Sequence, residues 1–398
     1  MKTIYLDNAA TTPMDPRVLE AMLPYFNQEF ANASSIHYAG SRAMSAVIAS
    51  KSKIADFLAC SADEVIFTSG ATESDNLAIF GVLGSILGAN KQNNQKPHLL
   101  VSAIEHEAVL EPAKHLEKQG VVDLDIIPVN ADGLVELSVI KKMIKDNTAL
   151  ISIMYANNEI GVVEPIDKIG VWLEKINQKR SQKIYFHTDA TQAVGYLDCS
   201  VKKLKVDLLS FSGHKIYGPK GIGVLYLKKG ALIKPMIYGG GQEKKIRSGT
   251  YNVPAIVGLA EAINILSNTK EKNLEIKRLK AWRDLLIKEL LKIPKAKLNG
   301  DKKNRLPNSV NIVFLGVEGE SIVLMLSKEG IMASTGSACS SGSLDPSHVL
   351  LAIGLKPEVA HGSLRLSLGR FNEISDIEAV IKIMPVIIKK LRQISPLK

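Results

Sequence analysis

The chain has 398 residues, of which 46% are hydrophobic and 23% are charged, and its formal net charge is +10. This composition is typical of a soluble globular protein, and the length exceeds what one hydrophobic core normally supports, so we expect two domains. No apolar run is long enough to span a membrane, and the first residues lack the apolar core of a signal peptide, which predicts a cytoplasmic protein without a membrane partner.

The positive charge does not by itself indicate a nucleic-acid-binding protein. The 50 Lys and Arg residues are spread along the chain and are accompanied by 40 Asp and Glu residues. Their density is highest in the helix-like region 270–305, where a solvated lysine-rich face explains them. We expect no direct contact with nucleic acid. A basic binding module, for example one for tRNA, is the alternative from a different class of function.

The three cysteines, Cys60, Cys199 and Cys339, are too few and too far apart for a disulfide framework. None has the Cys-x-x-Cys spacing of a metal or redox motif, so no metal site is expected. A reactive cysteine therefore has to be identified by its own surroundings.

In chain order, a helix is predicted over 15–29 and an amphipathic helix over 41–59. Short apolar runs follow, separated mostly by segments of helix length: 65–68, 99–104, 124–129, 149–154, 184–188, 206–211 and 222–227. This alternation predicts an α/β fold with a mostly parallel, seven-stranded sheet between helices. Because the last two runs are joined by a short connection, one strand there is a candidate for antiparallel pairing.

The pattern changes after the glycines at 239–241. A helix is expected to begin near Pro254, and a charged helical stretch over about 261–292 is expected to connect two domains. A strand over 309–315 and helices over 319–329 and 374–394 predict a smaller α+β unit. We therefore expect a large domain, 15–260, and a small domain formed by 1–14 and 261–398.

One connection between strands has an unusual composition. Lys215 lies among glycines and small residues in the segment 210–223, between two apolar runs. Burial disfavours the charged form of a lysine, which makes Lys215 a candidate for a Schiff base with a carbonyl cofactor, above all pyridoxal phosphate. A solvated His-Lys pair in a turn is the structural alternative, and these residues alone do not decide between the two.

Two further strand ends carry groups that suit such a cofactor. The turn 69–74, which includes Ala71 and Thr72, follows a strand and opens a helix, so its backbone N–H groups can bind a phosphate. Asp189 ends another buried strand, where a carboxylate can keep a pyridinium nitrogen protonated. Taken singly, the turn is more readily explained as a helix N-cap at Thr72 or Ser74, and an N-cap is also the alternative for Asp189.

Two other strand ends add a histidine and an amide. His106 can stack on a flat ring and shuttle protons near neutral pH, and Asn158 lies in a polar segment that follows an apolar strand. Polar lining of a strand end is the alternative for each. Together with Asp189 and Lys215 at one edge of a parallel sheet, however, these groups favour a cofactor site.

The segments 189–192, 210–215 and 336–340 together resemble the cysteine desulfurases. The resemblance is closest to the NifS/IscS group of the fold-type-I pyridoxal-phosphate enzymes, in the class-V aminotransferase family. It extends from 5–12 to 366–371, and the motifs occur in the family's order. One departure is Ala33, where the family usually has proline after the asparagine.

The resemblance implies that Lys215 forms the Schiff base with pyridoxal 5'-phosphate and that Lys215, His106 and Cys339 are the catalytic residues. It implies that Asp189 pairs with the pyridine nitrogen and that His106 stacks on the ring. It also implies the remaining cofactor contacts: Asn158 and Gln192 on the oxygen side of the ring, and Ala71, Thr72, Ser212 and His214 at the phosphate.

Two further roles implied by the resemblance concern the substrate and the assembly. Arg365, with Asn158, would bind the carboxylate of L-cysteine, a task that suits a planar guanidinium. Thr250 would reach the phosphate of a neighbouring subunit, which implies a homodimer with shared sites. The implied reaction removes sulfur from L-cysteine, releases L-alanine and leaves a persulfide on the enzyme.

Cys339 is the candidate acceptor of that sulfur. An isolated cysteine is usually a small buried hydrophobe, but Cys339 lies among serines and glycines without an apolar period, in what we expect to be a long mobile loop. An exposed thiolate there can attack the substrate sulfur. Cys60 and Cys199 are assigned structural roles.

Alternative functions share part of this site. An aminotransferase or related lyase of the same fold would use Lys215 and Asp189 but would not need Cys339, and a selenocysteine lyase would use the same groups. The persulfide is expected to pass to an acceptor protein, either an iron–sulfur scaffold or a tRNA-thiolation enzyme. The end of the chain, 391–398, resembles the tail with which iron–sulfur-type relatives contact a scaffold.

Overall fold

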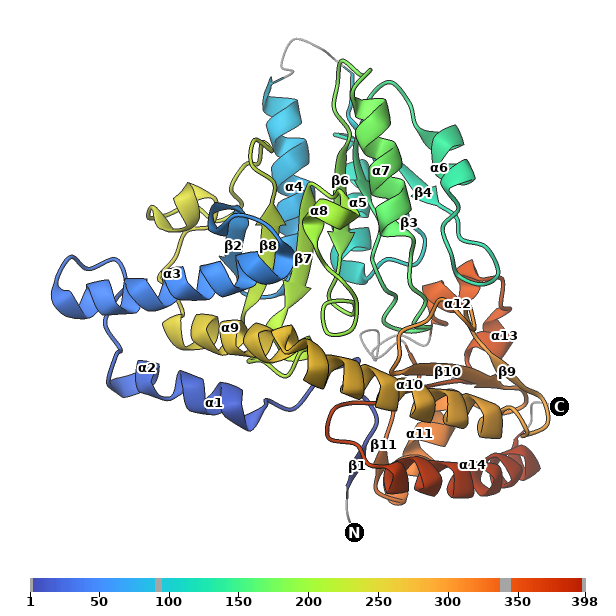
Figure 1. Cartoon of the computed structure of the whole chain (residues 1–398). Helices are drawn as coiled ribbons and strands as arrows, with labels where there is room; N and C mark the ends of the chain where they lie inside the picture. The colour runs from blue at the N-terminus through green and yellow to red at the C-terminus, as the bar shows by residue number, and fades with distance from the viewer. Residues whose placement is uncertain (1–2, 90–94, 337–344, 396–398) are drawn as a thin grey trace.

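The computed structural model describes residues 3–89, 95–336 and 345–395 (Figure 1). Its largest sheet has seven strands in the order β2-β8-β7-β6-β5-β3-β4. β8 runs antiparallel to β2 and β7, and the other neighbours are parallel. The predicted α/β fold is therefore confirmed, including the antiparallel strand at the short connection. The strands are β2 (Val65–Thr68), β3 (His98–Ser102), β4 (Asp123–Ile127), β5 (Thr148–Ser152), β6 (Tyr185–Asp189), β7 (Leu208–Ser212) and β8 (Gly223–Leu227).

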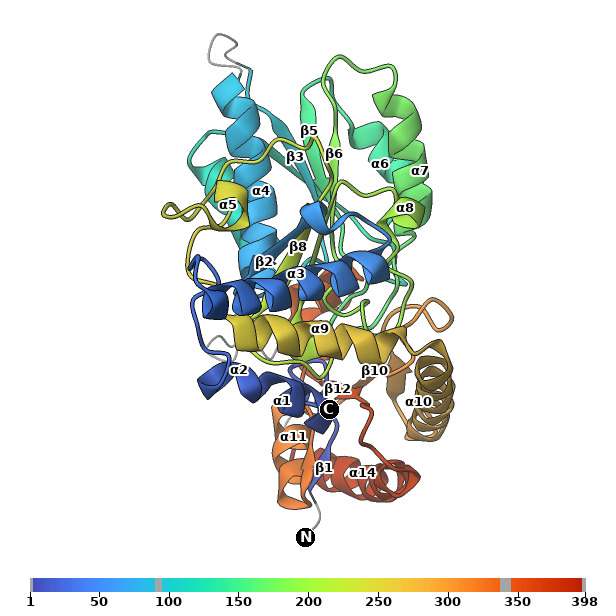
Figure 2. The same cartoon turned by 60° about the vertical axis from the view of Figure 1, so that its left-hand side comes forward.

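Helices cover both faces of this sheet (Figures 1 and 2). Ile66 of β2 packs into a cluster with α4 (Ala71–Ala89) and α5 (Glu107–Lys118), whereas its neighbour Phe67 packs into the cluster formed with α3 (Tyr38–Leu58), α7 (Ile166–Asn177) and α9 (Val253–Ser267). Successive strand residues point to opposite faces, so strands buried on both faces read as continuous apolar runs. The shorter helices α6 (Leu137–Met143) and α8 (Val201–Leu204) complete this part.

Two predicted helices are each divided in the structure. The helix expected over 15–29 consists of α1 (Pro16–Met22) and α2 (Pro24–Asn27), because Pro24 has no N–H to continue α1 and instead begins the next helix. The connector expected over 261–292 is also interrupted. Asn268 follows α9 and caps α10 (Thr269–Leu290), where its side chain accepts a hydrogen bond from Glu271 N at 3.3 Å.

A smaller unit forms around a three-stranded antiparallel sheet. The predicted strand over 309–315 is β10 (Ser309–Phe314), and it pairs with β9 (Ala296–Leu298) and β12 (Ser363–Ser367), which the sequence reading missed. β10 shares a hydrophobic core with α10, α11 (Gly319–Lys328) and α14 (Ile374–Ile394). The N-terminal strand β1 (Ile4–Tyr5) pairs with β11 (Ile331–Met332), and Leu6 is buried in the same core. The domain boundary near residue 260 stays a prediction.

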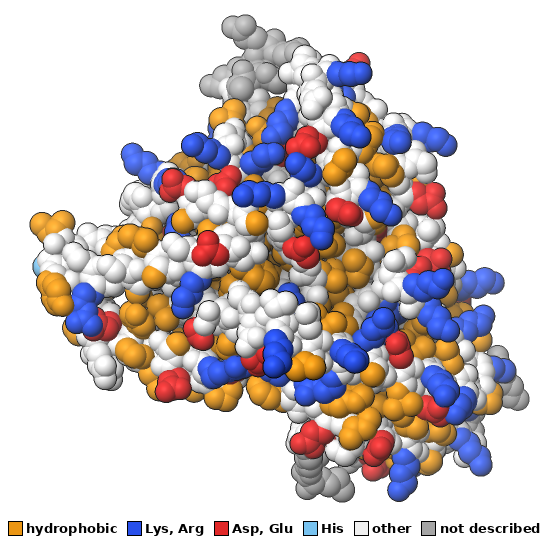
Figure 3. Space-filling view, viewed as in Figure 1, with side chains coloured by type: hydrophobic (Ala, Val, Ile, Leu, Met, Phe, Trp, Pro, Cys, Tyr) orange, Lys and Arg blue, Asp and Glu red, His pale blue; other side chains and the backbone are white. Residues whose placement is uncertain are grey.

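The smaller unit contacts the large sheet at the ends of β3 and β5. α12 (His348–Ala352) and α13 (Pro357–Ala360) pack against Ile104 and Met154, which follow strands of the large sheet. On the face shown in Figure 3, Lys and Arg side chains are spread over both parts and interspersed with Asp and Glu. Among the described helices, none is long and apolar enough to cross a membrane.

Candidate active site

A cavity of about 950 Å³ lies at the ends of the large-sheet strands, beside the smaller unit. The segments that follow β3, β5, β6 and β7 line it, together with the N-terminal segment and part of β12. Most of the predicted site residues meet there: Ala71, Thr72, His106, Asn158, Asp189, Gln192, Ser212, His214, Lys215 and Arg365. The structure thus brings together residues that lie almost 300 positions apart in the chain.

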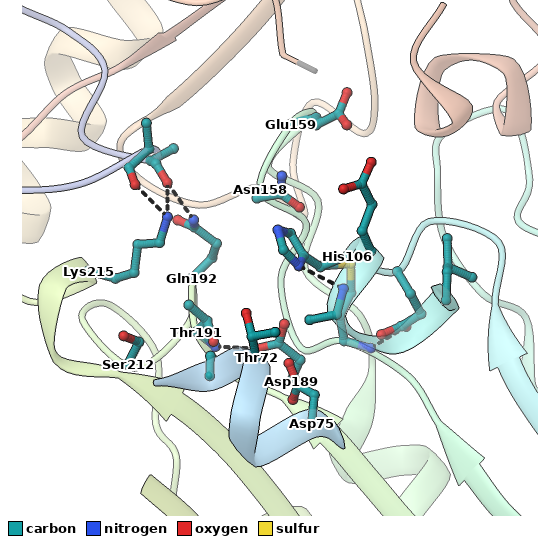
Figure 4. A pocket seen from close by; sticks show the side chains of 18 of the residues that line it. Thr72, Asp75, His106, Asn158, Glu159, Asp189, Thr191, Gln192, Ser212 and Lys215 are labelled. Atoms are coloured by element: carbon teal, nitrogen blue, oxygen red, sulfur yellow. Dashed lines mark hydrogen bonds between the residues drawn. The ribbon is translucent and has the colours of Figure 1, made fainter. Parts of the chain in front are cut away.

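Lys215 is held at one side of this cavity by the start of the chain (Figure 4). It ends a single turn, η2 (Gly213–Lys215), that follows β7. Its Nζ donates hydrogen bonds to Ala9 O at 2.6 Å and to Ala10 O at 2.8 Å. Gln192 Nε2 donates to the same Ala9 oxygen at 2.9 Å. The amine therefore has a fixed position in the cavity.

Asp189 supplies a buried carboxyl group at the end of β6. Burial, and then the nearby charge of Asp75, raise the pKa of Asp189 to about 6. Its Oδ1 accepts a hydrogen bond from Thr191 N at 2.8 Å. Asp75 is itself fully buried, and its Oδ1 lies 3.4 Å from Nε2 of His187. Two buried acids at one place favour a cationic ligand, because a positive charge would relieve their repulsion.

His106 is fixed on the opposite side from Lys215, next to Asn158 (Figure 4). It is the N-cap of α5, and its Nδ1 accepts a hydrogen bond from Ala108 N at 3.1 Å. Because Nδ1 is an acceptor, a neutral ring carries its proton on Nε2. The neighbouring Glu105 is buried, and burial raises the pKa of its carboxyl group.

The turn before α4 forms one end of the cavity. A Cβ on Gly70 would lie 3.9 Å from Ser212 Oγ, so the turn and this hydroxyl face the same space. A Cβ on Gly223 would lie only 2.6 Å from Gly70, which explains why the two backbones can approach so closely. Burial, and then Lys215 and Lys220, lower the pKa of His214 to about 4, so its imidazole is neutral at physiological pH.

Arg365 reaches the cavity from β12 and is almost fully buried. Its Nη1 donates to Asn158 O at 3.0 Å and to Gly336 O at 3.3 Å, and its Nη2 donates to Asp7 Oδ1 at 2.8 Å. Its Nε has no hydrogen-bond partner within the described part of the chain. A buried donor of this kind suits an anionic group of a ligand.

Comparisons with known proteins identify the relatives of this chain. Residues 4–380 match the model of the family described as aminotransferase class-V. The chain belongs to the class-V aminotransferase family. Within it, the chain is 49% identical to "Cysteine desulfurase IscS" of Methanosarcina thermophila, over 100% of this chain and 94% of that protein. It is 46% identical to "Cysteine desulfurase IscS 1" of Archaeoglobus fulgidus, over 99% of both chains.

Solved structures of class-V relatives share the fold. A structure titled "NIFS-LIKE PROTEIN" has a TM-score of 0.88 and 35% identity, and the alignment covers 98% of this chain and 100% of that one. A structure titled "SspA in complex with cysteine" has a TM-score of 0.78 and 36% identity, with coverage of 93% and 100%. The recognition made from the sequence motifs is confirmed.

Members of this family depend on pyridoxal phosphate, and the cavity has the groups that this cofactor requires. Lys215 offers an amine for its aldehyde, and Asp189 offers a buried carboxyl group for its cationic ring nitrogen. The turn at Ala71 and Thr72, at the N-terminus of a long helix, faces Ser212 and suits its phosphate. The residues present therefore fit the cofactor.

Two predicted site residues are not among those that line the cavity. Thr250 is exposed, in a segment after the left-handed residues 243–245, and does not border the cavity of its own chain. Cys339 lies outside the described residues, but Gly336 and Asp345, which are described, line the cavity. In the described ranges there is no group of three or more His, Cys, Asp or Glu residues that could hold a metal ion.

The sequence reading missed three buried acids at this site: Asp75, Glu105 and Glu159. A signal was available, because Glu105 directly follows the apolar run 99–104 and Glu159 lies in the segment after the run 149–154, next to His106 and Asn158, where an acid is costly to bury without a role. Asp75 had a weaker signal, since it lies near the N-terminus of α4, where an acid is normally explained by the helix dipole.

Proposed function

We propose that this chain is a pyridoxal-phosphate-dependent cysteine desulfurase, which converts L-cysteine to L-alanine and takes up the sulfur on Cys339. The observation that carries the proposal is one cavity lined by Lys215, Asp189 and Arg365 and also by Gly336 and Asp345, which flank the segment that contains Cys339. An aminotransferase would need Lys215, Asp189 and Arg365 but not Cys339. The cysteine-bound relative with 36% identity supports the same substrate.

When bound, pyridoxal phosphate supplies an electron sink that weakens the bonds at the substrate Cα. Asp189 would keep the proton on the ring nitrogen, and His106 would cover the ring. Arg365 Nε and the adjacent guanidinium nitrogens would bind and orient the substrate carboxylate. The Lys215 amine, whose position in the cavity is set by Ala9 O and Ala10 O, would accept the proton that leaves the substrate Cα and hold it as an ammonium group.

Sulfur transfer requires a thiolate, and two of the three cysteines are unsuited to it. Burial raises the pKa of both Cys60 and Cys199 to about 12, and neither lines the cavity. Cys339 is three residues from Gly336, so its Cα can be at most about 11 Å from that of Gly336. This distance allows it to reach the cavity that Gly336 lines.

The transfer step balances without an added oxidant. The Cys339 thiolate would form a bond to the substrate sulfur while the bond between that sulfur and the substrate Cβ breaks. The electron pair of the broken bond stays with carbon, which a proton then completes as alanine. The product on the enzyme is a persulfide, ready for attack by an acceptor thiol.

We also propose a homodimer in which Thr250 of each chain serves the phosphate site of the other. Thr250 is exposed and does not line the cavity of its own chain, which supports a role outside its own chain. Large exposed hydrophobic residues lie in the nearby segment 232–238 and in 26–38, among them Phe30, Ile36 and Tyr238. Such exposure is typical of surfaces that become covered in an assembly.

The sulfur acceptor is proposed to be an iron–sulfur scaffold or a tRNA-thiolation enzyme, in the reducing environment of the cytoplasm. The described cysteines, Cys60 and Cys199, are free thiols, which suits that environment. The names of the relatives, which are 46–49% identical, support a sulfur-donating role.

A single-turnover reaction with L-cysteine tests the proposed function. We expect the wild type to form one alanine per site and a sulfur adduct on the peptide that contains Cys339, measured by mass spectrometry. The variant Cys339→Ala should change the cofactor absorbance on binding L-cysteine but form little alanine. Equal alanine formation by the variant would favour the aminotransferase or lyase alternative.

A further inference from the structure

Asp75 is a buried acid to which the proposed reaction assigns no role. It belongs to α4 and lines the cavity, where Figure 4 shows it beside Asp189. Its side chain is fully buried, and neither of its carboxyl oxygens has a hydrogen-bond partner among the residues that the structure describes. Burying a carboxyl group without hydrogen bonds costs free energy. The position of Asp75 therefore suggests an interaction with a bound ligand.

The nearby His187 does not satisfy this carboxyl group. Its Nε2 lies 3.4 Å from Asp75 Oδ1 but is 2.9 Å from Ser210 Oγ on β7. Its Nδ1 lies 2.8 Å from Ser152 Oγ on β5. A serine hydroxyl can donate or accept a hydrogen bond, so the two serines can hold the ring in either protonation state. His187 is thus fixed at ion-pair distance from Asp75 without acting as its hydrogen-bond donor.

The side chain of Asp189 lies on the face of the sheet that α4 covers. Tyr185, His187 and Asp189 occupy alternate positions along β6 and therefore point to one face. Tyr185 packs in the cluster that contains apolar residues of α4, so Asp75 lies over the same face. Burial, and then the charge of Asp75, raise the pKa of Asp189, which shows that the two acids are close enough to affect each other.

Another acid of the site, Glu105, is held in a different way. Its Oε1 accepts hydrogen bonds from Ser102 Oγ at 2.5 Å and from Met154 N at 2.6 Å. Burial, and to a smaller extent the charges of Asp189 and Asp75, raise the pKa of Glu105, which favours its neutral form. The negative charge near the end of β6 therefore depends mainly on Asp75 and Asp189.

We propose that Asp75 is a positioning residue for the cofactor, whose negative charge acts with Asp189 to keep the ring nitrogen protonated. The inference rests on the proposed pairing of Asp189 with that nitrogen. Two carboxylates repel each other strongly where water is excluded, and a protonated nitrogen beside Asp189 reduces that repulsion. A ring without a basic nitrogen cannot do so. Asp75 therefore adds selectivity for a ring that carries a proton at this position.

The test compares pyridoxal phosphate with its deaza analogue, in which a C–H group replaces the ring nitrogen. Both compounds retain the aldehyde and the phosphate, so they differ only in the ability to carry a proton on the ring. Calorimetric titration of the full-length, cofactor-free protein gives the two dissociation constants at about pH 8, which is above the pKa of Asp189 of about 6. Their ratio is the nitrogen preference of each variant.

Two variants remove one buried acid each without changing the size of the side chain. Asp75→Asn removes the charge proposed to act on the ring nitrogen. Glu164→Gln is the matched control, because Glu164 is also buried and its Oε1 has no hydrogen-bond partner in the described ranges, but it lines a different cavity. Asp189→Asn, alone and combined with Asp75→Asn, tests whether the two acids act on one interaction.

We expect the nitrogen preference of Asp75→Asn to be about tenfold lower than that of the wild type, the factor that corresponds to one unit of pKa. Asp189→Asn should remove most of the preference, and adding Asp75→Asn to it should change the remainder by less than about twofold. Glu164→Gln should retain the wild-type preference. A purely structural role of Asp75 would weaken the binding of both compounds equally.

The inference is overturned if Asp75→Asn retains the wild-type preference within about twofold, or if it lowers the preference equally with and without the Asp189 carboxylate. If Asp75→Asn does not fold, Asp75→Ala decides by the same criteria. A wild type that binds both compounds equally, or an Asp189→Asn variant that keeps the full preference, would refute the proposed pairing of Asp189 and the inference with it.

Discussion

Replacement of Arg365 by lysine tests the most specific part of the proposed substrate site. Lysine keeps the positive charge but loses the planar arrangement of donors, of which Nε has no hydrogen-bond partner in the described ranges. A carboxylate bound by a guanidinium accepts two charge-assisted hydrogen bonds, and a lysine replaces only one of them. A hydrogen bond to a charged group contributes about 1.5–3 kcal/mol, which corresponds to a loss of about 10- to 150-fold in the affinity for L-cysteine.

The assay compares two thiols that differ only in the carboxylate. Wild type and Arg365→Lys are titrated with L-cysteine and with cysteamine, and binding is followed by the absorbance of the cofactor. Arg283→Lys is the control, because Arg283 is similarly buried and donates to the backbone oxygens of Arg305 and Leu306 outside the cavity. We expect Arg365→Lys to weaken the binding of L-cysteine and to leave cysteamine unchanged. An equal loss for both thiols would refute a carboxylate-binding role.

Three other predictions concern single titratable groups. Because the pKa of Cys60 and of Cys199 is about 12, the thiolate fraction of each at pH 8 is about a thousandfold below that of an ordinary thiol. Iodoacetamide should therefore label Cys339 first, which peptide mapping would show. Equal labelling of Cys60 would contradict this. Asp189→Asn should weaken pyridoxal-phosphate binding about 10- to 100-fold, because it removes the negative charge that would pair with the ring nitrogen. Titration of the cofactor-free protein with pyridoxal phosphate measures this affinity, and an unchanged affinity would disprove the pairing. Burial raises the pKa of Glu164 from 4.5 to about 8, so between these pH values the folded protein keeps a proton that the unfolded chain has released. The free energy of unfolding of the wild type should therefore fall relative to that of Glu164→Gln by about 1.4 kcal/mol per pH unit from about pH 4.5 to 8. Denaturant unfolding at several pH values would measure this difference, and a difference that does not change with pH would count against the prediction.

Several features were predictable from the sequence because they depend on neighbouring residues. The strands of the large sheet are buried on both faces, so each appears as a short apolar run, and β2 has the predicted bounds. The carboxyl ends of parallel strands meet at one edge, which is why the sequence could place His106, Asn158 and Asp189 at the same edge of the sheet, where they line one cavity. The division of the predicted helix at Pro24 shows the limit of a periodic pattern. The apolar period continues through Pro24, but a proline cannot donate the backbone hydrogen bond that would continue the helix.

The tertiary structure decided the contacts between segments that no local pattern links. Lys215 is held by carbonyl oxygens of Ala9 and Ala10, and Arg365 by those of Asn158 and Gly336. Backbone oxygens are the same at every position, so a sequence gives no sign of which one accepts a distant hydrogen bond. The type of chemistry is therefore readable from side chains and their spacing. The arrangement that makes it possible arises only when the segment after β1, the side chain of Arg365 on β12 and the start of α12 meet at the strand ends of the large sheet, because burial and long-range hydrogen bonds act through space and not along the chain.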